Sequence, residues 1–272
     1  MAALDIKKAF DCVNHKLLIF KLNTLFNINE SATKLFDNYL TNRSQILKCN
    51  NLYSSERSVS TGVPQGSVLG PLLFLIFIND ITENKNCYLF ADDCLIMCSG
   101  PDPVTAAHRL EESLAHYSNW YTNNLLTINS GKTNIMTISI KRVKLSSLPV
   151  IKFNSFDIKQ CEKIKYLGFF LDRYLTLKQN LSRTKQKLYP VIQDFHRNRK
   201  FITPYIASIW YTSLIRPILE YGAPSLYTAR KFITSEFIKV YGKAINFFVS
   251  FGSVCCIQYQ NGNCIAFTVL HH

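Results

Sequence analysis

The sequence has few acidic residues and no long uninterrupted run of apolar ones. Its 272 residues include 18 Asp and Glu against 31 Lys and Arg, so the formal charge is +13 and the pI is about 9.3. The longest apolar run, Val68–Ile78, contains a glycine and a proline and is too short to span a bilayer. The shortage of acidic residues favours a polyanionic partner such as nucleic acid, although a basic protein without such a partner has the same balance.

A secretory signal and a paired CxxC pattern are also absent. The start of the chain carries a charge as early as Asp5, which is not typical of a signal peptide. We therefore expect an intracellular protein whose nine cysteines are mostly free thiols. Neither Cys94 with Cys98 nor the group Cys255, Cys256 and Cys264 forms a paired CxxC pattern, so a zinc site is not expected.

The basic residues gather in one segment. Residues 139–200 contain 15 Lys and Arg against 4 Asp and Glu, whereas the rest of the chain has 16 against 14. One predicted helix in this segment carries four basic residues that could follow the phosphates of a nucleic acid: Lys178, Arg183, Lys185 and Lys187. Alternatively, they form a solvated face, and then binding to nucleic acid would depend little on salt.

The pattern of apolar residues predicts an α+β fold with a central antiparallel sheet, covering helices and a helical region after it. Strands are predicted at 2–4, on both sides of the turn in 87–97, at 134–140, and three times within 150–171. Helices are predicted from Asp5 through Leu22, then at 31–40 with Ser31 as its cap, 69–81, 103–124, 177–197 and 205–220. A hairpin or loop is predicted at 50–60. We expect three parts: 1–175, 176–250 and an atypical tail at 251–272.

Three carboxylates stand at the ends of predicted strands. Asp5 directly follows the first strand, and Asp92 and Asp93 form a tight turn between two apolar strands. If the first strand lies beside this hairpin, Asp5 and Asp92 meet at one end of the sheet. Clustered carboxylates suit Mg²⁺, and two such ions can clamp the reacting oxygens in phosphoryl transfer. The alternative is a solvated hairpin tip with no ligand.

Five motifs in this order resemble the reverse transcriptase domain of non-LTR retrotransposons, over roughly residues 4 to 172. They are Leu4–His15 (LDIKKAFDCVNH), Gly62–Pro71 (GVPQGSVLGP), Phe90–Asp93 (FADD), Leu126–Thr133 (LTINSGKT) and Tyr166–Gly168 (YLG). The helical region to about residue 248 is compatible with the thumb of that family, and the sheet region with its palm.

The resemblance implies an RNA-directed DNA polymerase that acts on an RNA template, a DNA primer and deoxynucleoside triphosphates. A membrane is not expected among its partners. Asp5 and Asp92 would be the principal ligands of two Mg²⁺ ions, which Mn²⁺ could replace. Asp93 would be a supporting carboxylate, and the backbone carbonyl of Ile6 could reach one ion. In the family such a protein acts at chromosomal DNA, so we expect a nuclear location.

The resemblance also implies roles for residues around the carboxylates. Phe10 would exclude a ribose 2′-OH, although it could equally be a core aromatic on a helix face. Gln65 and Gly66 would line the nucleotide pocket, with Gly66 allowing close approach of the backbone. Lys132 would donate a proton to the leaving pyrophosphate, although it could be an ordinary surface lysine. Tyr166, Leu167 and Gly168 would form the primer grip.

The sequence departs from the family at both ends. It begins inside the first motif, so we expect the fingers region to be largely missing, poor stability and weak or no polymerase activity. No endonuclease is expected in the chain, and whether a separate chain supplies the fingers or the endonuclease is open. Two alternatives remain: an inactive remnant that only binds nucleic acid, and a primer-independent palm-fold nucleotidyl cyclase or nuclease. The last would leave Gln65 and the primer grip without a role.

Overall fold

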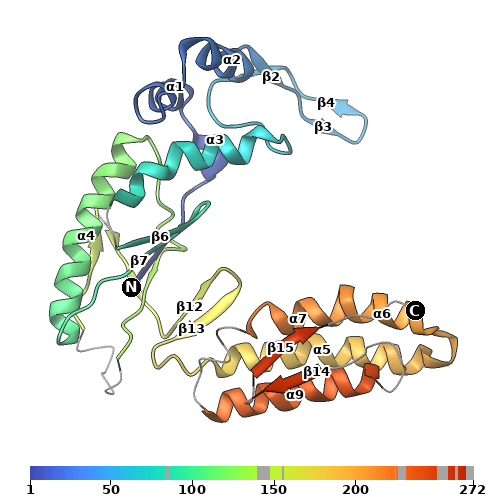
Figure 1. The fold of residues 1–272 in the computed structure, drawn as a ribbon. Helices are drawn as coiled ribbons and strands as arrows, with labels where there is room; N and C mark the ends of the chain where they lie inside the picture. The colour runs from blue at the N-terminus through green and yellow to red at the C-terminus, as the bar shows by residue number, and fades with distance from the viewer. Residues whose placement is uncertain are drawn as a thin grey trace. The chain divides into compact units, whose positions relative to one another are not determined.

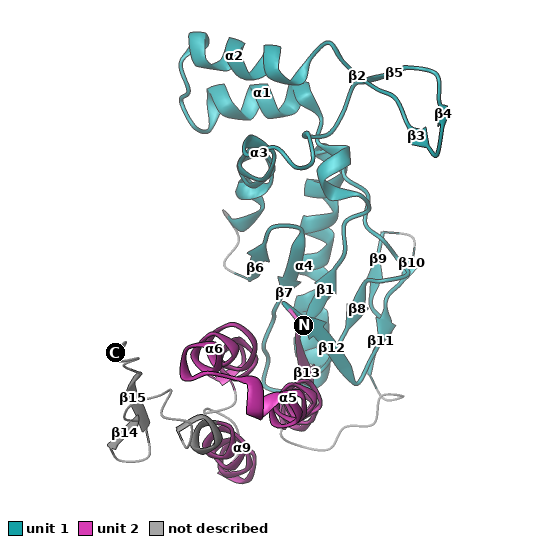
Figure 2. Cartoon of the chain, turned by 90° about the vertical axis from the view of Figure 1, so that its right-hand side faces the viewer, with its two compact units in different colours: residues 1–167 teal, residues 168–272 magenta. Residues whose placement is uncertain are grey.

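The chain forms two compact units. The computed structural model describes residues 1–83, 86–139, 148–154, 156–223, 225, 231–249, 257–260 and 263–267. The units are Met1–Leu167 and Gly168–His272 (Figure 2), divided within a two-residue turn. This division lies a few residues before the predicted boundary near 175. The predicted tail is counted with the second unit; in its described part, β14 (Ile257–Gln260) pairs with β15 (Asn263–Phe267).

A five-stranded sheet forms the centre of the first unit, in the order β11-β8-β1-β7-β6. Its strands are β1 (Ala2–Leu4), β6 (Cys87–Phe90), β7 (Asp93–Ile96), β8 (Asn134–Ile135) and β11 (Lys159–Gln160). The pairings of β1 with β7 and β8, and of β6 with β7, are antiparallel as predicted. The edge pair β8–β11 is parallel, which differs from the prediction.

The first strand lies between two neighbours, as Figure 2 shows. Ala2 and Leu4 are buried, and Ala2 pairs with Ile96 on one side and Ile135 on the other. A strand with partners on both edges satisfies its backbone groups, so three residues suffice to fix its place. The amino group of Met1 also donates to the carbonyl of Met136, at 2.9 Å.

The prediction of one continuous helix from Asp5 through Leu22 is wrong. The structure has a short 3₁₀ helix, η1 (Ala9–Cys12), followed by α1 (His15–Thr24). Lys8 has a φ of 47°, and the extended Asn14 caps α1 by accepting from the backbone N–H of Leu17. Both residues interrupt the helical backbone although the apolar spacing continues across them.

The other helices of this unit begin or end close to the predicted positions. They are α2 (Glu30–Leu40), α3 (Leu69–Ile78), the 3₁₀ helix η2 (Asn79–Glu83) and α4 (Pro103–Asn123). The predicted cap Ser31 is wrong, because Asn29 caps α2 by accepting from the N–H of Ala32 at 2.8 Å. Asn29 lies two residues before Ser31. It has the extended backbone conformation of a cap residue, and its side-chain oxygen accepts the hydrogen bond.

Helix packing builds the core of the first unit. Helix α1 lies against α2 and α3, and α4 contacts β7 (Figure 1). Leu18, Leu22, Phe74 and Phe77 are fully buried between these helices. Lys21 is buried there too, and its ammonium donates to the Phe77 carbonyl of α3 at 2.7 Å and to Asp80 of η2 at 2.8 Å, which ties α1 to both elements.

The predicted hairpin at 50–60 is part of a longer one. Strand β2 (Arg43–Gln45) pairs with β5 (Arg57–Val59), and between them β3 (Lys48–Cys49) pairs with β4 (Leu52–Tyr53). The hairpin therefore begins before Asn50. Its strands are mostly exposed, so they carry no apolar alternation from which their start could be predicted.

More strands follow α4 than predicted. Three strands were expected within 150–171, but the structure has five. Besides β11, they are β9 (Lys152–Phe153), β10 (Phe156–Asp157), β12 (Lys163–Tyr166) and β13 (Phe169–Asp172). The strand predicted at 134–140 is present only as β8, and residue 140 lies outside the described residues. Two-residue strands are too short to show an alternating pattern.

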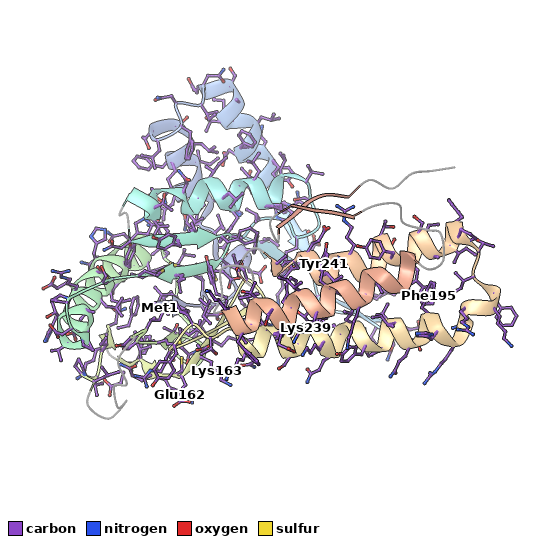
Figure 3. All side chains as sticks on the ribbon, turned by 60° about the horizontal axis from the view of Figure 1, so that its bottom comes forward. Met1, Glu162, Lys163, Phe195, Lys239 and Tyr241 are labelled. Carbon is purple, nitrogen blue, oxygen red and sulfur yellow. The ribbon has the colours of Figure 1, made fainter. Side chains whose placement is uncertain are left out.

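The second unit is mainly helical. It contains α5 (Lys178–Asn198), the 3₁₀ helix η4 (Arg199–Phe201), α6 (Pro204–Trp210), the π-helix η5 (Tyr211–Ile215), α7 (Arg216–Glu220) and α9 (Lys231–Val249). Phe195 of α5 and Tyr241 of α9 are buried in its core, whereas Lys239 is exposed (Figure 3). The helix predicted at 205–220 is thus present, with a π-helical turn in its middle.

No helix in the described ranges is both long enough and apolar enough to cross a bilayer.

Candidate active site

The sheet brings the three predicted carboxylates to one end. Leu4 pairs with Cys94, so Asp5 leaves β1 beside the start of β7, where Asp93 stands. Asp92 lies in the turn before β7, and Ala91 makes that turn with a φ of 51°. Strand register therefore places the residues as the sequence predicted, with β1 beside the hairpin.

A cavity of about 730 Å³ opens at this end of the sheet. Six of the residues predicted for the site line it: Asp5, Ile6, Phe10, Gln65, Asp92 and Lys132. Asp93 and Gly66 are not among the lining residues. The cavity therefore joins an end of the sheet to the glycine-rich loop at 62–67 and to the lysine motif at 126–133.

The hairpin turn is a region of negative charge. Partial burial raises the pKa of Asp93, and the neighbouring carboxylates of Asp92 and Asp5 raise it further, while Lys165 opposes them. Carboxylates that disfavour each other's ionisation are stabilised by a cation. In the part of the chain that the structure describes, no three His, Cys, Asp or Glu side chains are gathered closely enough to hold a metal by themselves.

Asp5 is held by the segment at 126–133. The backbone carbonyl of Asp5 accepts from the N–H of Asn129 at 2.7 Å, and the Asn129 side-chain amide donates to Asp5 Oδ2 at 3.0 Å. Lys132 Nζ lies 3.9 Å from the same oxygen. Sequence reasoning assigned Lys132 a role but gave none to Asn129. Asn129 lies within the quoted motif, but only the fold shows which residue it contacts.

Phe10 fits both interpretations made from the sequence. It lines the cavity, and its ring stacks on Phe74 of α3 with centroids 4.4 Å apart. The ring is thus fixed by the core while one side faces the cavity.

Gln65 is held by Asp11, which sequence reasoning missed. The Gln65 side-chain amide donates to the Asp11 carboxylate at 2.7 Å, and both residues line the cavity. Asp11 belongs to η1, and its acidic side chain was the only signal that could have drawn attention to it.

Two glycines in the loop at 62–67 have different reasons to be glycine. Gly62 has a φ of +90°, and a Cβ there would stand 2.8 Å from the backbone oxygen of Asp11. Gly66 has a φ of +79°, but a Cβ there would meet no atom within 4 Å. Gly62 therefore allows the close packing of loop and η1, whereas Gly66 is needed only for its backbone conformation.

The predicted primer grip includes the position in the sequence where the units are divided: Tyr166 and Leu167 belong to the first unit and Gly168 to the second. In the first unit, the Tyr166 hydroxyl donates to the carbonyl of Tyr88 at 3.2 Å. Burial raises the pKa of Tyr166, and Asp93 raises it further, so the end of β12 lies close to the acidic turn. Leu167 and Gly168 have φ angles of 47° and 75°.

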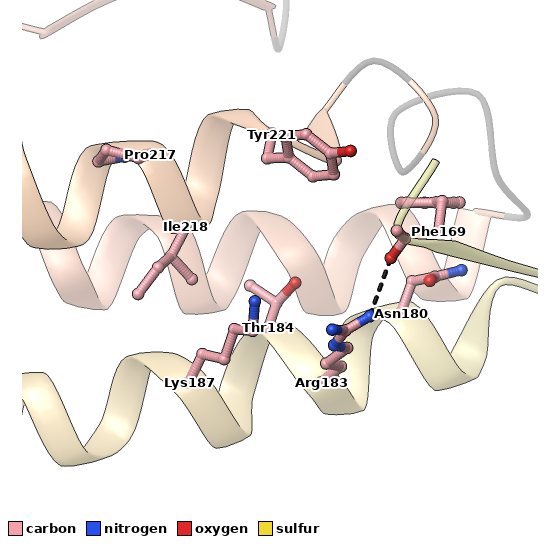
Figure 4. Close-up of a pocket in the computed structure, with 10 residues that line it drawn as sticks. Phe169, Asn180, Arg183, Thr184, Lys187, Pro217, Ile218 and Tyr221 are labelled. Atoms are coloured by element: carbon pink, nitrogen blue, oxygen red, sulfur yellow. Dashed lines mark hydrogen bonds between the residues drawn. The ribbon is translucent and has the colours of Figure 1, made fainter. Parts of the chain in front are cut away.

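The four basic residues of α5 do not share one face. Arg183 and Lys187, one turn apart, line a cavity of about 390 Å³ in the second unit (Figure 4), where Arg183 donates to the carbonyl of Gly168 at 2.9 Å. Lys185 instead pairs with Glu236 of α9 at 3.3 Å. Lys178 lies two turns before Lys185, on the same side of the helix. A count of basic residues along the sequence could not show which face of α5 each one occupies.

Comparison with known proteins agrees with the motifs. The family described as reverse transcriptase (RNA-dependent DNA polymerase) matches residues 1–171. The chain belongs to this family.

Two relatives of this chain come from a transposon and a mobile element. It is 31% identical, over 80% of its length and 25% of the relative, to the probable RNA-directed DNA polymerase from transposon BS of Drosophila melanogaster. It is 30% identical, over 81% of its length and 25% of the relative, to the RNA-directed DNA polymerase from mobile element jockey of the same species. The chain thus spans about a quarter of the length of these relatives.

Among solved structures, a chain in the structure of telomerase from Candida albicans with a fragment of telomeric RNA is loosely similar. The TM-score is 0.39 with 13% sequence identity, and the match covers 93% of this chain and 45% of that chain.

Proposed function

We propose that this chain is the palm and thumb-like part of an RNA-directed DNA polymerase of a non-LTR retroelement. It would transfer deoxynucleotides to the 3′-OH of a DNA primer on an RNA template. The observation that carries the proposal is the cavity in which Asp5, directly after β1, and Asp92, in the turn before β7, meet Gln65 and Lys132. Membership of the reverse transcriptase family supports the same activity.

The residues at the end of the sheet fit a pair of divalent cations. Asp5 and Asp92 would hold two Mg²⁺ ions, with the Ile6 carbonyl and Asp93 as further oxygen donors; Mn²⁺ could replace Mg²⁺. All of these donors are oxygens, as Mg²⁺ prefers. When bound, such ions lower the cost of the negative charge that develops on the attacking and leaving oxygens.

The cavity walls would hold the incoming nucleotide. Phe10, fixed by Phe74, would lie against the sugar and exclude a 2′-OH, while Gln65 and Gly66 would line the pocket. The primer 3′-OH would give up its proton to water as its oxygen forms a bond to the α-phosphorus, and the bond from the α-phosphorus to the bridging oxygen of the leaving pyrophosphate would break. Lys132, near Asp5, would donate a proton to the pyrophosphate that leaves.

The primer and the duplex would be held outside this cavity. Tyr166, Leu167 and Gly168 would hold the primer end, as the family's primer grip does. Arg183 and Lys187 would contact phosphates of the duplex, since they lie on one face of α5.

Primer extension tests the proposal. Wild type and Asp92→Asn would be compared on an RNA template with an annealed DNA primer, Mg²⁺ and all four deoxynucleotides. We expect the substitution to reduce extension by more than about a hundredfold, since metal-stabilised charge contributes several kcal/mol. Asp37→Asn, an exposed position on α2, is the matched control and should extend like wild type.

Two results would contradict the proposal. Salt-sensitive duplex binding without any extension would indicate a chain that only binds nucleic acid. A nucleotide-derived or cleaved product formed without primer, and lost with Asp92→Asn, would indicate the cyclase or nuclease chemistry.

A further inference from the structure

Among the described residues, the side-chain contacts of the Asp5 carboxylate fall on one of its two oxygens. Both side chains that reach it, the Asn129 amide at 3.0 Å and the Lys132 ammonium at 3.9 Å, contact Oδ2. Within the described ranges, no hydrogen bond or ion pair falls on Oδ1. Asp5 lines the cavity, and its side chain is 36% exposed, so Oδ1 is the oxygen left for a ligand.

Asn129 is itself fixed at several points. Its side-chain oxygen accepts from the N–H of Gly131 at 3.2 Å, which orients the amide so that its nitrogen faces Asp5. Its backbone N–H donates to the Asp5 carbonyl, and its own carbonyl accepts from the N–H groups of Lys132 and Thr133. The donor that contacts Asp5 therefore belongs to a rigid turn.

We infer that Asn129 is a positioning residue that fixes the orientation of the Asp5 carboxylate, so that Oδ1 is directed to a divalent cation in the cavity. The inference rests on the proposed function, because it assigns Asp5 to a cation. A carboxylate free to rotate about its Cβ–Cγ bond would offer either oxygen, and part of the binding free energy would be spent on ordering it. Groups that orient a ligand by hydrogen bonding typically change metal affinity by about 10- to 100-fold when removed.

Binding of Mn²⁺ to the whole chain, without nucleic acid, provides a readout other than activity. The free Mn²⁺ signal in electron paramagnetic resonance would be titrated with wild type, Asp5→Asn, Asn129→Ala and the double variant. We expect Asn129→Ala to weaken Mn²⁺ binding by about 10- to 100-fold. In the Asp5→Asn background the same substitution should have no further effect, because Asn129 acts through Asp5.

Asn134→Ala is the matched control. Asn134 donates to the Lys132 carbonyl at 2.7 Å, so the variant loses a hydrogen bond in the same turn without losing a contact to Asp5. Asn129→Ser is a second variant: its hydroxyl can accept from Gly131 but is too short to reach Asp5 Oδ2. It should weaken Mn²⁺ binding as Asn129→Ala does, and circular dichroism would show that each variant is folded.

The outcomes separate the inference from the proposed function. If Asp5→Asn weakens Mn²⁺ binding and both Asn129 variants do not, the positioning role is wrong and the metal site stands. If Asn134→Ala weakens binding as much as Asn129→Ala, or the effects add in the double variant, Asn129 acts through the turn and the inference is overturned. If wild type binds no Mn²⁺, or Asp5→Asn changes nothing, the metal site and the inference both fail.

Discussion

Replacing Lys187 with alanine should reduce the salt dependence of duplex binding, whereas replacing Lys185 should not. The two residues lie on the same helix and differ in what they face. Lys187 lines the cavity beside Arg183, and Lys185 pairs with Glu236. The same chemical change at the two positions therefore tests which face of α5 contacts phosphates.

The expected size follows from counterion release. Each phosphate contact contributes about 0.9 to the slope of log Kobs against log salt concentration for duplex DNA. Between about 50 and 200 mM salt, one contact accounts for a change of about threefold in affinity. Lys187→Ala should lower the slope by about 0.9, and the double variant with Arg183→Ala by nearly twice as much.

Lys185→Ala is a fair control because it does not leave an isolated carboxylate. Glu236 also contacts Lys239 at 3.0 Å, so it keeps a cationic partner. Surface ion pairs of this kind contribute about 0–1 kcal/mol, so the variant should remain folded. The slopes would be measured by fluorescence anisotropy with a labelled RNA–DNA hybrid at several KCl concentrations. Equal losses of slope for Lys185→Ala and Lys187→Ala would refute the assignment of faces, as would an unchanged slope in the double variant.

Two further predictions concern stability, measured by urea unfolding. Gly62→Ala should destabilise the chain more than Gly66→Ala, because both carry a backbone strain of about 1–2 kcal/mol but only the first also meets the Asp11 backbone; equal losses would contradict this. Burial opposes ionisation of Asp172, but the hydrogen bonds it accepts from the backbone and side chain of Thr176, from Leu177 and from Tyr174 lower its pKa below the ordinary value. Its stabilisation is therefore present above that ordinary value and is lost as the pH falls through the lowered one. Asp172→Asn should cost about 1–3 kcal/mol at pH 7, and this cost should shrink steadily as the pH is lowered below the ordinary pKa of an aspartate; a cost that does not change with pH would show that the charge is not its cause.

The pattern of apolar residues was sufficient to predict that Asp5, Asp92 and Asp93 lie at one end of the sheet. Strand composition around Asp92 and Asp93 predicted the hairpin, and Asp5 could be placed because it directly follows a buried strand. These are local patterns, and a single antiparallel pairing of β1 with β7 brings them together. The same local signals predicted α2, α3, α4 and α5 to within a few residues.

What could not be predicted depends on backbone conformation or on contacts across the fold. Lys8 and Asn14 break the helix after Asp5 although the apolar spacing runs through them. The ion pair of Lys185 with Glu236 depends on how α5 and α9 pack, which the sequence of α5 does not contain. The sequence gives the number of basic residues in α5, but the packing of neighbouring helices decides which of them line a cavity and which form ion pairs.

The motif Leu4–His15 and the motif Leu126–Thr133 are far apart in the sequence but are joined at Asp5. Strand β1 ends at Leu4, so its pairing does not include Asp5. Beyond its end, Ile6 bridges to Ile128 and the N–H of Lys7 donates to the Thr127 carbonyl, which extends the pairing onto the segment that carries Lys132. Asp5 and Lys132 are therefore held by one segment, which reaches Asp5 through the backbone N–H of Asn129 as well as through the Asn129 side chain.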